Sequence, residues 1–130
     1  MGTQNVEHSW ALGKKRYVIQ GVFFPNGSSA IDATKNRGSA GWSVAYTSTG
    51  LFTITLADTW LSLISFVANF SVSAATAVFP QWKIATYSSV SSLILESING
   101  SGTLTDIAAN ASNSISFRIC LSQDTVVTNG

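Results

Sequence analysis

The histidine, the cysteine and the six carboxylates of this 130-residue chain are candidates for acid–base or nucleophilic chemistry, and they are scattered along it. They are His8, Cys120, Glu7, Asp32, Asp58, Glu96, Asp106 and Asp124. General acid–base catalysis needs two titratable groups that the fold brings together. A glycosidase would need two carboxylates about 5 to 10 Å apart, and only Asp32 and Asp106 both fall on expected loops. We therefore expect that the chain is not an enzyme.

Partial matches to known motifs fail at a defining residue. Segment 41–45, Gly-Trp-Ser-Val-Ala, lacks the last glycine of a nucleophile elbow. Asp58 ends an apolar run as in an aspartic protease, but Trp60 replaces the glycine of that motif, so we interpret Asp58 as a turn cap. Segment 100–103 is too short for a phosphate loop. A single histidine and a single cysteine cannot supply a zinc site, so we expect no metal and no cofactor.

Seven residues are candidates for a protein interface, because of their charge or an aromatic ring in a polar segment. They are Trp10, Lys14, Lys15, Arg16, Asp32, Lys35 and Arg37. The basic run before the first strand and the charged loop at 28–40 either dock onto an acidic protein surface or are simply solvated. Trp10 either anchors the chain to a neighbouring molecule or packs on its own domain.

The chain carries few charges: 7 basic and 6 acidic residues, 10% of the total, with a net charge of +1. A typical globular domain has about 25% charged residues. Without concentrated positive charge, we expect neither a nucleic-acid partner nor an acidic membrane partner. The 20 serines and 13 threonines make much of the surface neutral hydroxyl, which is cheaper to bury than ions. We expect a homo-oligomer, and a serine-rich monomer is the alternative.

Apolar and polar residues alternate with a period of two over most of the chain, and no segment shows helical spacing. The pattern predicts an all-β fold, a β-sandwich or jelly roll of seven or eight antiparallel strands. Turn signals are Pro25-Asn26-Gly27 and the segment 99–102. The expected strands are 17–24, 42–47, 51–56, 64–72, 82–86, 93–95, 103–107 and 114–121. A loop is expected at 106–113, so it overlaps the end of the strand at 103–107 and includes Asp106.

Segment 59–82 has no charge and is long enough to cross a membrane as a helix. Its large apolar residues Ile64, Phe66, Phe70 and Val72 fall on even positions, which favours a strand with these side chains on one face. We therefore expect no membrane partner. Cys120 lies in an alternating run, and we interpret it as a buried, inert thiol.

The ends of the chain lack this pattern. We expect an N-terminal arm at 1–15, one β-sandwich domain at 16–121 and a C-terminal tail at 122–130. Arms of this kind order against a neighbouring molecule. The first residues lack the basic start and apolar stretch of a secretory signal, so we expect none.

Three stretches resemble small structural proteins of tailed bacteriophages, the capsid decoration or cement proteins. They are 16–27 (RYVIQGVFFPNG), 41–47 with 49–56 (GWSVAYT, TGLFTITL) and 106–117. The resemblance implies a β-sandwich subunit, made in the bacterial cytoplasm, that forms a small homo-oligomer, for which we favour a trimer over a dimer. It implies binding to the major capsid protein on the outer surface of the virion.

A phage tail or fibre module, or a lectin-like domain, is the alternative function. Trp42, Trp60 or Trp82 could then provide a stacking platform for sugar rings. Trp42 and Trp82 are in phase with Val44 and Ile84, so we expect these two rings to face the core.

Overall fold

The computed structural model describes residues 16–73, 77–84 and 89–122, which form eight strands and a short 3-10 helix. The predicted arm at 1–15, with Trp10, Lys14 and Lys15, lies outside the described residues, as does 123–130 of the predicted tail. The elements are β1 (Arg16–Phe23), η1 (Ala33–Lys35), β2 (Arg37–Gly38), β3 (Trp42–Ser48), β4 (Leu51–Trp60), β5 (Ser62–Ser71), β6 (Val78–Lys83), β7 (Val90–Asn99) and β8 (Ser114–Ser122).

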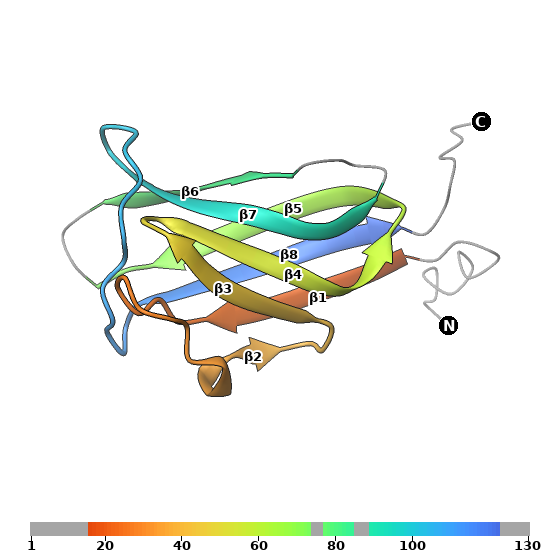
Figure 1. Cartoon of the computed structure of the whole chain (residues 1–130), viewed down its shortest axis with the longest axis horizontal. Helices are drawn as coiled ribbons and strands as arrows, with labels where there is room; N and C mark the ends of the chain where they lie inside the picture. Colours follow the sequence, from red (N-terminus) through yellow and green to blue (C-terminus); the bar gives the residue numbers. More distant parts are fainter. Residues whose placement is uncertain (1–15, 74–76, 85–88, 123–130) are drawn as a thin grey trace, which may run out of the picture.

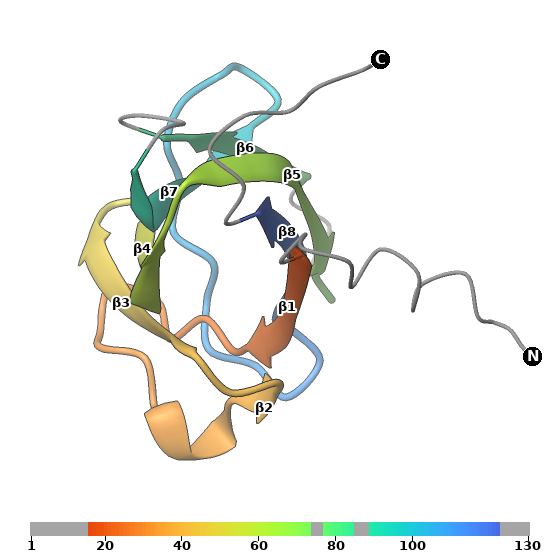
Figure 2. The same cartoon turned by 90° about the vertical axis from the view of Figure 1, so that its right-hand side faces the viewer.

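The strands form two four-stranded antiparallel sheets that pack against each other (Figure 1). One sheet has the order β2-β1-β8-β5 and the other β3-β4-β7-β6. Figure 2 shows the two sheets from the side, curved around a common interior. The predicted β-sandwich is confirmed. β8 continues to Ser122, one residue beyond the expected end of the domain.

Aromatic pairs join the two sheets across the core. One ring of each pair comes from each sheet, and the centroids are 4.8 to 5.3 Å apart in edge-to-face geometry, which adds to the hydrophobic gain. The pairs are Phe23–Phe52, Phe117–Trp42 and Phe66–Trp82. Gly21 makes room for one of them, because a Cβ there would lie 2.3 Å from the Trp42 ring.

The observed secondary structure differs from the predicted one in two segments, one expected as a loop and one expected as a strand. The expected loop at 28–40 contains η1 and the two-residue strand β2, whose Arg37 pairs with Val22 of β1. The expected strand at 103–107 makes a single bridge, Ile98 to Leu104. The chain leaves the ladder there because Ile107 turns into the core and its carbonyl accepts a hydrogen bond from another loop.

Two further predictions were wrong at strand ends. β6 begins at Val78, so Pro80 lies inside a strand and not in a connection before it. β6 is an edge strand, where proline is tolerated because no outer neighbour needs its missing N–H. Asp58 is not a turn cap, since β4 continues through it to Trp60 and the side chain is exposed.

A bulge in β5 changes which side chains face outward. Leu63 pairs with Leu121 and Ser65 with Cys120, which leaves Ile64 as an extra residue. Ile64 was expected on the same face as Phe66, but Phe66 is buried and Ile64 is 46% exposed. Cys120 was expected to be buried; it is half-buried on the outward face of β8.

Candidate functional site

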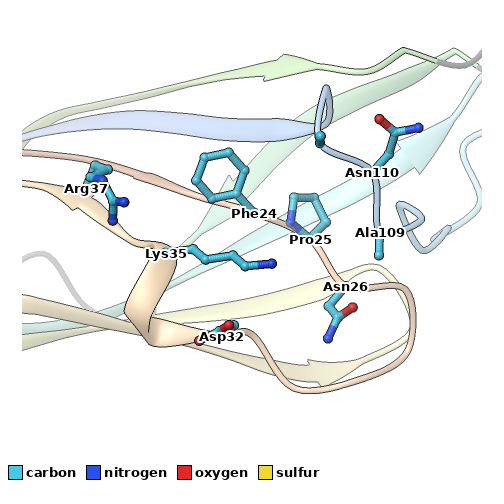
Figure 3. A pocket seen from close by; sticks show the side chains of 9 residues that line it. Phe24, Pro25, Asn26, Asp32, Lys35, Arg37, Ala109 and Asn110 are labelled. Atoms are coloured by element: carbon cyan, nitrogen blue, oxygen red, sulfur yellow. The ribbon is translucent and has the colours of Figure 1, made fainter.

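A hollow of about 480 Å³, here called the loop pocket, lies at the end of the sandwich beyond β1. Its charged lining is Asp32, Lys35 and Arg37, three of the predicted interface residues (Figure 3). The rest of the lining comes from residues 24–26, which follow β1, and residues 109–111, which precede β8. The fold therefore brings a charged loop and an uncharged loop to one site.

Local hydrogen bonds hold the two loops together. The Pro25-Asn26-Gly27 turn forms as predicted, and Asn26 Nδ2 donates to the carbonyl oxygen of Ala30 at 3.0 Å. Gly27 adopts a φ of 62°, which glycine takes at little cost, and its N–H donates to the carbonyl of Ile107 at 2.9 Å. Because Ile107 is buried, this bond fixes the turn to the body of the sandwich.

Two charged groups of the loop, Asp32 and Arg37, form hydrogen bonds with neighbouring residues of the same loop. Asp32 Oδ1 accepts from the amide of Thr34 at 3.1 Å and from its hydroxyl at 2.6 Å. These two bonds, the hydroxyl one foremost, lower the pKa of Asp32, and the charge of Lys35 adds to the effect. Arg37 Nη1 donates to the carbonyl oxygens of Thr34 and Asn36 at 3.2 and 2.9 Å.

Neither cation of the loop pocket is in a salt bridge with a carboxylate of residues 16–73, 77–84 or 89–122. Within the described ranges the single salt bridge, 3.2 Å long, joins Lys83 Nζ to Glu96 Oε2 on the other sheet. Lys35 and Arg37 are both exposed. The pocket lining thus presents two positive charges that no acidic side chain in the described part of the protein contacts directly.

The remaining predicted interface residues are not part of this site. Arg16 is exposed at the first position of β1, opposite Ser122, whereas the loop pocket follows the last position of that strand. Trp10, Lys14 and Lys15 lie outside the described residues, so their predicted role stays a prediction.

The neutral part of the pocket was not predicted from the sequence. Phe24 and Pro25 contribute apolar surface, and Asn110 contributes an amide whose Oδ1 accepts from the amide of Ser112 at 2.8 Å. The Pro-Asn-Gly signal marked the first loop. No local sequence signal indicates that this first loop lies next to residues 109–111, because the two segments meet through the pairing of β1 with β8.

Both carboxylates considered for catalysis accept hydrogen bonds from other groups of the chain. Asp106 accepts from the Tyr46 hydroxyl at 3.0 Å and from the Gly50 amide at 2.8 Å, whereas Asp32 accepts from Thr34. In the part of the chain that the structure describes, no three His, Cys, Asp or Glu side chains are grouped so that they could hold a metal ion.

The tryptophans considered as sugar platforms pack inward. Trp60 is buried and stacks on Tyr17 with ring centroids 5.0 Å apart. Trp42 and Trp82 are half-buried with their rings against phenylalanines of the opposite sheet, as their phase predicts. Trp42 Nε1 also donates to the carbonyl of Ser39 at 2.8 Å.

The outward surface of the β2-β1-β8-β5 sheet, here called the β8 face, exposes apolar side chains. Val18 is 41% exposed, Ile64 46% and Val67 53%. Val18 lies beside Cys120, and Val67 lies beside Arg118, because residues directly opposite in antiparallel strands point to the same side. None of the four strands of this sheet contains Asp or Glu.

No protein-family model, curated protein or solved structure matches the chain. Among residues 16–73, 77–84 and 89–122, no helix has the length and hydropathy of a membrane span.

Proposed function

We propose that this chain is a capsid decoration protein of a phage virion. In this proposal it forms a homo-oligomer, a trimer in preference to a dimer, and attaches to the major capsid protein on the outside of the head. The resemblance of segments 16–27, 41–56 and 106–117 to such proteins supports the proposal, and so does the β-sandwich that the resemblance implies.

The observation that carries the self-association is the β8 face. Three large aliphatic side chains, Val18, Ile64 and Val67, are each more than 40% exposed on or beside its central strands. Their neighbours across the strands include Cys120 and Arg118. Exposed apolar surface beside an arginine and without a carboxylate on its strands is typical of a protein interface, where arginine is enriched.

In the proposed mechanism the protein stabilises the shell by binding to it, and no covalent reaction takes place. A protein that binds only the assembled shell stabilises that shell by mass action. A trimer attaches through three equivalent contacts, so that weak individual contacts add up to firm attachment. The low charge of the chain suits this role, because few ions have to be desolvated when its faces are covered.

The test compares two single substitutions on opposite outward faces of the sandwich. Val67→Asp places a charge on the β8 face, and Thr55→Asp places the same charge on the exposed side of β4 as the control. We expect a trimer mass in sedimentation for the unmodified chain and Thr55→Asp, and a monomer for Val67→Asp. Purified heads that lack the protein should bind the first two and become more resistant to heat.

A monomeric unmodified chain at micromolar concentration would contradict the self-association. Failure to co-sediment with heads, or heads equally heat-stable with and without the protein, would contradict the decoration role. Saturable binding to host glycans in its place would favour the fibre or lectin alternative.

A further inference from the structure

We propose that the loop pocket binds a single carboxylate, the side chain of a Glu or Asp residue on an acidic segment of the partner protein. This inference rests on the proposed function and deepens it, because it names the chemistry of the partner at one site.

Charge is the first argument. Lys35 and Arg37 contribute two positive charges to the lining, and Asp32 contributes one negative charge. The Asp32 carboxylate is occupied by Thr34 and lies beyond 4 Å of either cation. The pocket therefore carries a net charge of +1, which one carboxylate neutralises.

The position of the cations is the second argument. Arg37 is tied to two carbonyl oxygens through Nη1, so its guanidinium is held in place before a ligand arrives. Its other N–H groups are left to form the paired bonds that a carboxylate accepts. In Figure 3 the Lys35 side chain lies between Asp32 and Pro25. Groups that are ordered beforehand lose less entropy on binding.

The neutral lining suits the rest of an acidic side chain. Phe24, Pro25, Ala109 and Ala111 provide apolar walls for the methylene groups of a glutamate. Asn110 has its oxygen occupied by Ser112, which leaves its NH₂ group as a donor toward an anion. A hollow of about 480 Å³ is large enough for a side chain with its adjoining backbone.

The same features disfavour a phosphate group. Phosphate sites usually offer several free backbone amides, but those of Gly27, Ser29, Lys35 and Asn36 already donate to carbonyl oxygens of the loops. Asp32 on the rim would also repel a dianion more strongly than a monoanion. A carboxylate therefore fits the pocket better than a phosphate.

The test is an NMR titration of the isotope-labelled full chain with two tetrapeptides. The probes are acetyl-Ala-Glu-Leu-Ala-amide and its Gln counterpart, which has the same shape without the charge. We expect the Glu peptide to shift the resonances of residues 24–37 and 109–111 and to bind at least fivefold more tightly than the Gln peptide. Inorganic phosphate should bind more weakly than the Glu peptide.

Three variants locate the effect. Lys35→Gln and Arg37→Gln should each weaken binding of the Glu peptide at least fivefold, whereas Lys83→Gln, which changes a lysine on the other sheet, should leave it unchanged. Asp32→Asn should strengthen binding twofold or more, because it removes the like charge. Equal binding of the Glu and Gln peptides, or tighter binding of phosphate, would overturn the assignment.

Attachment to heads separates this inference from the proposed function. If the pocket binds a carboxylate and the protein is a decoration protein, Lys35→Gln and Arg37→Gln stay trimeric but bind heads more weakly than Lys83→Gln does. If all variants bind heads equally well, the partner's carboxylate is not the ligand of the pocket, and the decoration role stands. If the unmodified chain does not bind heads at all, the decoration role itself fails.

Discussion

Asp106 shows how one residue can hold distant segments in register. Its carboxylate accepts from the Tyr46 hydroxyl on β3 and from the amide of Gly50 in the turn between β3 and β4. Gly50 is buried, so its N–H would otherwise have no water to bond. The carboxylate therefore fastens the hairpin to the segment between β7 and β8.

Replacing Asp106 with Ala should lower the free energy of unfolding by about 2 to 3 kcal/mol, because two donors lose a charged acceptor. Asp106→Asn retains one acceptor oxygen and should cost less. Urea unfolding followed by fluorescence measures both. An Ala variant as stable as the unmodified chain would show that these bonds contribute nothing.

The same contact predicts an alkaline pH dependence. Burial raises the pKa of the Tyr46 phenol, and the hydrogen bond to Asp106 raises it further. Above about pH 10 the phenol ionises in the unfolded chain first, so stability falls as the pH rises. Asp106→Ala removes part of the shift and should make this fall shallower in urea unfolding at pH 9 to 11.

The bulge in strand β5 determines which of its side chains point into the core and which point outward. Up to Leu63 the inward positions are odd, and from Phe66 onward they are even, because Ile64 is an extra residue. A sequence pattern read with one phase cannot place both halves of such a strand. The bulge turns Ile64 outward, where it adds to the β8 face.

The bulge predicts that truncating Phe66 destabilises the protein much more than truncating Ile64. Phe66→Ala should cost about 3 to 5 kcal/mol of unfolding free energy, because it empties a core site against Trp82. Ile64→Ala should cost less than about 1 kcal/mol, since the side chain is half exposed. Similar losses for both variants in urea unfolding would mean that β5 has no bulge here.

At the scale of the whole molecule, the two sheets differ in charge. The β2-β1-β8-β5 sheet carries Arg16, Arg37 and Arg118 and no carboxylate. The other sheet contains Asp58 and the Lys83–Glu96 salt bridge. One side of the sandwich is therefore positive and apolar, and the other is neutral to negative.

This division predicts that the two proposed contacts respond differently to salt. Raising NaCl from 0.1 to 1 M shortens the Debye length from about 10 to 3 Å. Self-association through the apolar side chains of the β8 face should persist, whereas the Glu peptide should bind the loop pocket severalfold more weakly. Sedimentation and NMR titration measure these responses. Loss of the oligomer at 1 M would indicate that ionic contacts hold it together.

The fold class, the turn at residues 25–27 and the inward phase of Trp42 and Trp82 were predictable from the order of the amino acids alone. These features depend on alternation and turn residues within a few positions, so they can be read locally. The charged loop with Asp32, Lys35 and Arg37 was likewise visible as a candidate interface.

The groups that those residues contact depend on how the two sheets and their loops pack in three dimensions. The loop pocket needs residues 109–111, and the anchor at Asp106 needs Tyr46. The outward turn of Ile64 depends on its register with β8. Each of these contacts joins segments that are far apart in the chain. They meet through long-range strand pairing, which cannot be read from the order of neighbouring residues.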